Sequence, residues 1–187
     1  MQPGGRAPAP GDLALVQAFA NTKDLLTQQD VLTDPEMLRA WLMTRQLLQR
    51  DETIDEEDFQ RALAFREALR SLVCANTGAP LDAGVREVLD AAARRAQLTL
   101  RFSPAGPASL EPGATGLDRA LGRLLAIVFT SLSEGSWARL KACRNEACQW
   151  IYYDTSKNRV GVWCTMTMCG NRVKTATYRQ KRRARQR

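Results

Sequence analysis

Two matched cysteine pairs near the C-terminal end constrain the fold of this chain more than any other feature of the sequence. The pairs, Cys143–Cys148 and Cys164–Cys169, each enclose four residues, and fifteen residues separate one pair from the other. Two short chelating loops of this kind bring four thiolates to one tetrahedral metal ion. We therefore expect one structural Zn²⁺ ion, bound by Cys143, Cys148, Cys164 and Cys169.

The residue types available favour a structural zinc site over a catalytic one. Catalytic zinc keeps a water ligand and uses His or carboxylate groups, and the 187 residues of this chain include no histidine. The sequence also displays no nucleophile–base pair, no glycine-rich phosphate loop and no carboxylate pair with catalytic spacing. We therefore expect that the protein is not an enzyme. Iron on four thiolates and two disulfides in a secreted protein are the alternatives for the cysteines.

The apolar runs and the first residues indicate a cytoplasmic protein. Residues 1–11 are rich in Pro, Gly and Ala and lack the apolar core of a signal peptide, so we expect a disordered lead-in there. No apolar run approaches the roughly 20 residues that cross a bilayer. We expect no membrane partner and a cytoplasmic, nucleoid-associated location, where the thiols stay reduced and available to metal.

Positive charge is concentrated in the same region as the cysteines. Positions 140–187 contain twelve Lys and Arg against two acidic residues, whereas positions 1–139 carry more acidic than basic residues. A basic end on a mildly acidic body is typical of a protein that binds a polyanion through one part.

Positions 12–140 predict one mainly α domain with a small β-hairpin. Capping residues and apolar periodicity indicate a helix from Leu13 with an apolar stripe to Leu26, a second from Asp34-Pro35 to Leu48, a third from Asp55 to Asn76, and two more over 81–96 and 117–133. Alternating residues over 98–102 and 108–110 indicate the hairpin.

Two polar residues interrupt the first apolar stripe. Asn21 and Thr22 either line a pocket that binds a small-molecule effector or bond to neighbouring helices inside the domain. The domain is accordingly expected to sense a ligand or to form a homodimer.

Positions 141–187 predict a treble-clef-like four-cysteine finger that ends in a basic helix. The first cysteine pair lies on a loop, residues 149–154 and 160–163 have strand character, and Thr167 could cap a helix that places Cys169 in its first turn. About 45 residues bury too little apolar surface to fold unaided, so metal binding would supply folding free energy.

The basic residues of the finger are the candidates for contact with nucleic acid. Arg172 and the residues after it include eight Lys and Arg and no acidic residue. The candidates are Lys157, Asn158, Arg159, Asn171, Arg172, Lys174, Arg179, Lys181, Arg182, Arg183 and Arg185. A nucleic acid is the partner that these charges indicate. The alternatives are RNA stacked on the aromatic residues of the finger, a thiol-redox or zinc-release sensor, and a tail that only improves solubility.

Several motifs resemble one family of two-part proteins. The run from Tyr152-Tyr-Asp-Thr-Ser-Lys-Asn-Arg159 through Trp163-Cys164 to Cys169-Gly-Asn-Arg172 resembles the CGNR zinc finger. Upstream, Phe19-Ala-Asn-Thr22, Leu38-Arg-Ala-Trp-Leu42 and Phe65-Arg-Glu-Ala-Leu69 resemble the ABATE-type domain that precedes this finger in bacterial stress-response transcription regulators. The resemblance implies zinc on the four cysteines and DNA binding through the finger. Where the family tends to have basic residues, however, this chain has Val160-Gly161-Val162.

Overall fold

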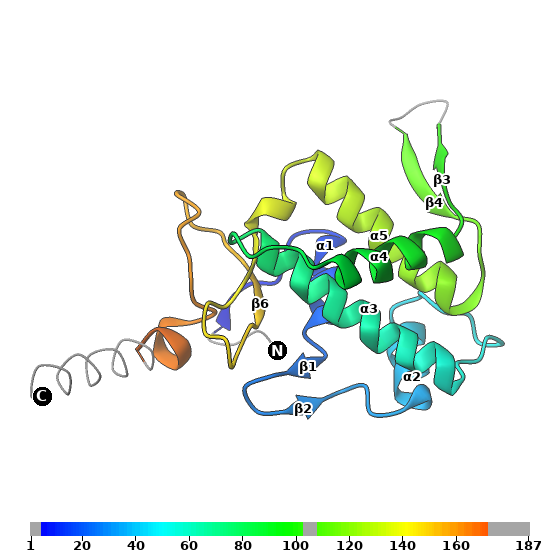
Figure 1. The fold of residues 1–187 in the computed structure, drawn as a ribbon, viewed down its shortest axis with the longest axis horizontal. Coiled ribbons are helices and arrows are strands. Elements are labelled where there is room, and N and C mark those ends of the chain that lie inside the picture. Colours follow the sequence, from blue (N-terminus) through cyan, green and yellow to red (C-terminus); the bar gives the residue numbers. More distant parts are fainter. Residues whose placement is uncertain (1–4, 103–107, 172–187) are drawn as a thin grey trace, which may run out of the picture.

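A helical body carries the zinc-finger part at one end and a β-hairpin at the opposite end (Figure 1). The computed structural model describes residues 5–102 and 108–171. Within these ranges, no helix has both the length and the apolar character needed to cross a membrane.

Five α-helices among the described residues make up most of the body, which confirms the mainly α fold class. Their bounds are α1 Leu13–Ala20, α2 Pro35–Thr44, α3 Glu56–Ala75, α4 Ala83–Arg95 and α5 Gly116–Ser133. The acidic residues expected to start the second and third helices do so, because Asp34 accepts a hydrogen bond from the Met37 amide and Asp55 from the Asp58 amide. A 3₁₀ turn, Trp137–Arg139, leads from α5 into the finger.

Three two-stranded antiparallel sheets occur in the part of the chain that the structure describes. They pair β1 Lys23–Asp24 with β2 Gln29–Asp30, β3 Leu98–Arg101 with β4 Ser109–Pro112, and β5 Leu140–Ala142 with β6 Ile151–Tyr153. The β3–β4 hairpin confirms the alternating pattern around Leu98, which pairs with Pro112. The other two sheets were not predicted.

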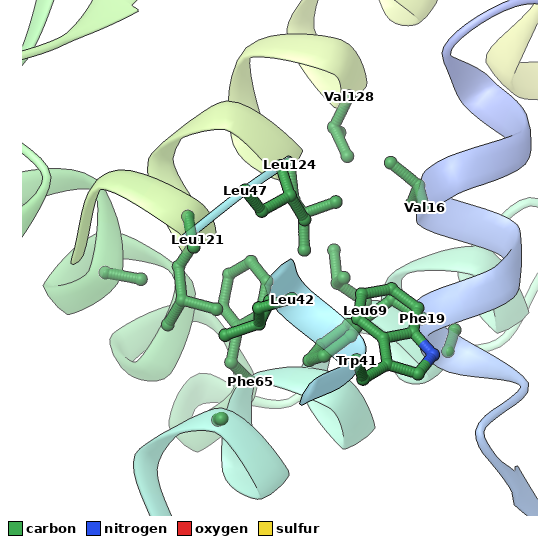
Figure 2. Close-up of a cluster of buried hydrophobic side chains, with 14 of the residues drawn as sticks. Val16, Phe19, Trp41, Leu42, Leu47, Phe65, Leu69, Leu121, Leu124 and Val128 are labelled. Atoms are coloured by element: carbon green, nitrogen blue, oxygen red, sulfur yellow. The ribbon is translucent and has the colours of Figure 1, made fainter. Parts of the chain in front are cut away.

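The main core lies where α1, α2, α3 and α5 meet (Figure 2). Phe19 and Trp41 pack edge to face there, with ring centroids 5.2 Å apart. Leu140, Ala142 and Ile151 of β5 and β6 belong to the same buried cluster. The apolar core is therefore continuous from the helical body into the finger.

The first two helices end earlier than the apolar pattern predicted. The α1 helix stops at Ala20, and the chain turns through Asn21 into the β1–β2 ribbon, so Leu26 lies in the ribbon loop and packs against the cysteine cluster. The α2 helix stops at Thr44 because Gln46 adopts a left-handed conformation with φ of 57°. Leu48 is buried beyond the end of that helix.

Candidate metal centre

The four predicted cysteines meet at one point in the finger. Their sulfur atoms all lie within 4.8 Å of one another, and all four residues are buried. The sulfurs of Cys148 and Cys164 are 3.8 Å apart. A zinc ion bound to four sulfurs at about 2.3 Å requires sulfur–sulfur distances of about 3.8 Å, whereas a disulfide requires about 2.05 Å. The donor set and spacing therefore fit one structural zinc ion, as the sequence predicted.

The loop between β5 and β6 presents the first cysteine pair. The Cys143 amide donates to the Trp150 carbonyl at 2.9 Å, which closes the loop at the end of the two strands. Inside the loop, the Asn145 carbonyl accepts from the Cys148 amide at 2.8 Å. The Asn145 side chain accepts in turn from the Ala147 amide at 3.2 Å. This tight turn aims both sulfurs at the same point.

A short helical segment, Met166–Gly170, presents the second pair. Its capping residue is Thr165, whose hydroxyl accepts from the Met168 amide at 3.0 Å, so the expected cap at Thr167 is wrong by two residues. The Cys169 amide donates to the Thr165 carbonyl at 3.2 Å. Gly170 packs closely against its neighbours, since a Cβ atom there would lie 2.7 Å from the Met166 sulfur and 3.2 Å from the Trp163 ring. A side chain at this position would displace the end of the exposed Met166 side chain.

Hydrogen bonds join the two cysteine loops and reach one of the sulfurs. The Arg144 amide donates to the Val162 carbonyl at 2.9 Å. The Asn145 side-chain amide donates to the Cys169 sulfur at 3.5 Å. Such donors stabilise the net negative charge of a zinc ion with four thiolates.

The thiols share their protons within the cluster. Hydrogen bonds from Cys148 and Cys164 lower the pKa of Cys143, and the hydrogen bonds with Cys143 and Cys164 raise the pKa of Cys148. Zinc binding would therefore release protons from the thiols that stay neutral in the free cluster.

The strand expected over 160–163 is absent from the described finger. The short strand β6 pairs instead with β5, which precedes the first cysteine. Burial explains this choice, because Leu140, Ala142 and Ile151 all enter the main core. Residues 155–161 form a loop anchored on Asp154, whose carboxylate accepts from the Ser156 and Gly161 amides.

The N-terminal segment lies against the finger. Composition led us to expect a disordered lead-in over 1–11, of which residues 5–11 are described. Arg6 donates to the carbonyls of Trp163 and Cys164, and its guanidinium lies 4.5 Å from the centre of the Tyr152 ring. Ala9 is buried, and its amide donates to the Gln17 side chain at 2.7 Å. These contacts hold residues 6–9 across the finger.

Asn21 joins the helical domain to the finger. Its side-chain amide donates to the Ile151 carbonyl at 2.7 Å, and its side-chain oxygen accepts from the Ile151 amide at 2.9 Å. The buried Gln17 side chain also donates to the Ile151 carbonyl, at 3.1 Å. Buried Arg70 of α3 adds bonds to the carbonyls of Ala20, Lys23 and Gln149. The two parts of the chain are thus held by polar contacts as well as by the shared core.

Thr22 also bonds within the protein. Its hydroxyl donates to the Phe19 carbonyl at 2.8 Å and accepts from Arg66 at 3.2 Å. Arg66 in turn forms an ion pair with Asp30 of β2. These bonds account for the polar residues inside the apolar segment, and effector binding by Asn21 and Thr22 stays a prediction.

Four of the nucleic-acid candidates are described, and all four are exposed. Lys157, Asn158 and Arg159 lie on the loop between β6 and the second cysteine pair, while Asn171 ends the described chain. The remaining candidates lie outside the described residues: Arg172, Lys174, Arg179, Lys181, Arg182, Arg183 and Arg185.

A buried four-cysteine centre, built on a hairpin and a short helix and joined to a helical domain, defines a zinc-finger protein. Comparison with family models agrees. The CGNR zinc finger model matches residues 139–182, and the ABATE model, described as "Putative stress-induced transcription regulator", matches residues 11–134. The ABATE match covers more than half of the chain, so the chain belongs to the ABATE family and carries a CGNR zinc finger. No curated protein matches the chain.

Proposed function

We propose that this protein is a zinc-dependent transcription regulator whose finger contacts DNA and whose helical domain holds and regulates the finger. The observation that carries the proposal is a buried tetrathiolate centre within the segment in which basic residues outnumber acidic ones by twelve to two. A zinc ion with four thiolate ligands has no free position for water or substrate, so the centre supports a fold rather than a reaction. The ABATE family description supports the regulatory role.

The placement of the aromatic residues favours duplex DNA over unpaired RNA. Recognition of single-stranded RNA relies on aromatic faces that stack on bases. In the finger, Tyr152 is buried, and Trp150 and Trp163 pack against the cysteine cluster. Exposed Lys157 and Arg159 suit phosphate contacts instead.

The contacts between the two parts support direct regulation of the finger by the helical domain. A ligand or a second copy that shifts α1 or α3 would move Asn21 or Arg70, which bond to Ile151 and Gln149 next to the first cysteine loop. A groove of about 840 Å³ between the start of α1, β4 and α5 offers space for a small-molecule effector. Apolar Leu15 and Ile127 line it, together with charged groups of both signs: Arg45, Arg123, Asp12, Glu111 and Glu134.

Selection from a pool of random duplex DNA tests the proposal. The zinc-loaded full-length protein is incubated with the pool at near-physiological salt, and a parallel arm uses structured RNA of equal length. We expect enrichment of a narrow duplex motif, whose symmetry would report the oligomeric state. Equal or stronger enrichment of RNA would contradict the DNA proposal. Rapid thiol oxidation with ordered zinc loss, and no enrichment in either arm, would favour the redox sensor.

A further inference from the structure

One loop of the finger is held in place by a buried ion pair from outside the cysteine cluster. The basic loop, residues 155–161, connects β6 to the second cysteine pair and is largely exposed. Asp154, at the start of the loop, is 1% exposed, and Lys141 of β5 is 8% exposed. The Lys141 ammonium lies 2.9 Å from the Asp154 carboxylate. This pair touches both ends of the basic loop.

The Asp154 carboxylate fixes the backbone of the loop through two amides. One carboxylate oxygen accepts from the Ser156 amide at 3.0 Å, and the other accepts from the Gly161 amide at 2.9 Å. A Cβ atom on Gly161 would lie 2.9 Å from the same carboxylate. A side chain at this position would press against the carboxylate that holds the loop, so Gly161 allows the loop backbone to approach Asp154 closely.

Two basic side chains, in addition, donate hydrogen bonds to backbone carbonyl groups near both ends of the loop. The Lys141 ammonium also donates to the Arg159 carbonyl and, at 3.4 Å, to the Gly161 carbonyl. Arg139 donates to the carbonyls of Asp154 and Ser156 at 2.9 and 3.2 Å. These two cations are therefore engaged within the finger, and the loop backbone is bonded on either side of residues 157 and 158.

The same bonds leave two other cations pointing to solvent. Lys157 and Arg159 are exposed, and neither forms an ion pair with any residue that the structure describes. Arg159 adopts a left-handed conformation with φ of 53°, which a non-glycine residue holds only when its surroundings impose it. Here the bond from Lys141 to the Arg159 carbonyl supplies that constraint.

We propose that the basic loop is a preformed contact for the phosphate backbone of duplex DNA, and that the Asp154–Lys141 pair positions it. A loop already fixed in its binding conformation loses less conformational entropy on binding than a flexible one. Phosphate contacts set the register of a protein on DNA without reading its sequence. The basic loop would thus act separately from the segment that follows Asn171. This inference rests on the proposed function.

A buried ion pair contributes little to the free energy of unfolding compared with well-packed apolar groups. We therefore assign the Asp154–Lys141 pair the role of fixing the local backbone geometry. In this finger the geometry is that of the basic loop, because the pair bonds to Ser156, Arg159 and Gly161. A neutral pair of similar size can therefore keep the finger folded and release the loop.

Two variants and a control separate these roles. Lys157→Ala with Arg159→Gly removes the charges, and glycine tolerates the left-handed position. Asp154→Asn with Lys141→Met removes the pair and keeps both exposed cations. Arg101→Thr removes an exposed charge from β3, at the end of the molecule opposite the finger (Figure 1). Fluorescence anisotropy with a labelled duplex of mixed sequence gives affinity over a salt series from about 0.05 to 0.2 M, and each protein is assayed for zinc.

We expect the charge variant to lower the slope of log affinity against log salt by about two, and to weaken binding about 30-fold at 0.15 M salt. The neutral-pair variant should keep one zinc ion and its slope and bind roughly tenfold more weakly, because the freed loop must be ordered. The control should bind as the unaltered protein does.

Three results would overturn the inference while leaving the proposed function in place. These are an unchanged slope in the charge variant, an unchanged affinity in the neutral-pair variant, and loss of zinc from the neutral-pair variant, which would assign the pair to the metal centre. No salt-dependent binding of the unaltered, zinc-loaded protein to DNA would instead overturn both.

Discussion

Replacing Asn21 with alanine should loosen the finger from the helical domain. The change removes two hydrogen bonds, of 2.7 and 2.9 Å, between the Asn21 side chain and the Ile151 backbone. The Ile151 carbonyl keeps its bond from Gln17, but the buried Ile151 amide loses its only described partner. A stranded buried donor costs about 1–3 kcal/mol and the second lost bond about 1 kcal/mol, so we expect a loss of about 2–4 kcal/mol.

Thermal unfolding measures this loss. For a chain of this size, about 1 kcal/mol lowers Tm by about 2–4 °C, so the expected shift is about 4–16 °C. Helix content is followed by circular dichroism and zinc release by a metal-binding dye in the same sample. Because the core is continuous from the body into β5 and β6, both signals should move together.

The matched control is Asn158→Ala. Asn158 is exposed on the basic loop and makes no side-chain hydrogen bond among those described, so its removal should change stability by less than about 0.5 kcal/mol. The reasoning would be refuted if Asn21→Ala melted with the same Tm as the control. It would also be refuted if the unaltered protein released zinc in a transition separate from the loss of helix.

Three further changes test other parts of the account. Cys164→Ser should abolish stoichiometric zinc binding and DNA affinity, because three thiolates cannot complete the structural site; normal zinc content by elemental analysis would contradict this. Lys181→Ala should weaken DNA binding alike for all sequences and lower the salt slope by about one; an unchanged affinity would indicate a tail that only aids solubility. Glu52→Gln should destabilise the protein by about 1–2 kcal/mol at pH 7, since Glu52 accepts from the Gln49 and Gly116 amides and from Arg119. Burial raises the pKa of Glu52, but these bonds and the Arg119 charge outweigh it and hold the pKa below 4.5. The stabilisation by Glu52 is thus complete above that value and is lost as the pH falls through the folded pKa. Urea unfolding should therefore show that the difference in free energy of unfolding between the unaltered protein and Glu52→Gln shrinks below about pH 4.5. A difference that stays constant with pH would refute the assignment.

The metal centre was the part of the site most predictable from sequence. Two closely spaced cysteine pairs can bring four thiols to one metal ion only if the two loops that carry them fold toward the same point. The structure shows this arrangement, because the sulfurs of Cys143 and Cys169 meet although 25 residues lie between them in the sequence. The residues that shape the loops were missed. Asn145 lies two positions after a cysteine, where an Asn can form a local turn, and this signal was available in the sequence. Thr165 and Thr167 are equally good capping residues, and only the position of the helix start decides between them.

Helix starts were predictable because the capping side chains act on amides two or three residues away, as Asp34 and Asp55 do. The β1–β2 ribbon was not, because its two-residue polar strands carry no apolar alternation. The partner of β6 was also missed, since pairing with Leu140–Ala142 depends on burial in a core shared with distant helices. Buried Arg66 and Arg70 were unforeseen for the same reason, because their partners lie far along the chain.

The central claim is that zinc on the four cysteines organises a surface that binds DNA. Its most direct test is to remove zinc stepwise with a chelator while recording zinc content by native mass spectrometry and duplex affinity by anisotropy on the same samples. The account predicts one zinc ion per chain, an affinity that falls in proportion to zinc content, and recovery when zinc is restored. DNA binding that persists unchanged in the zinc-free protein would contradict it.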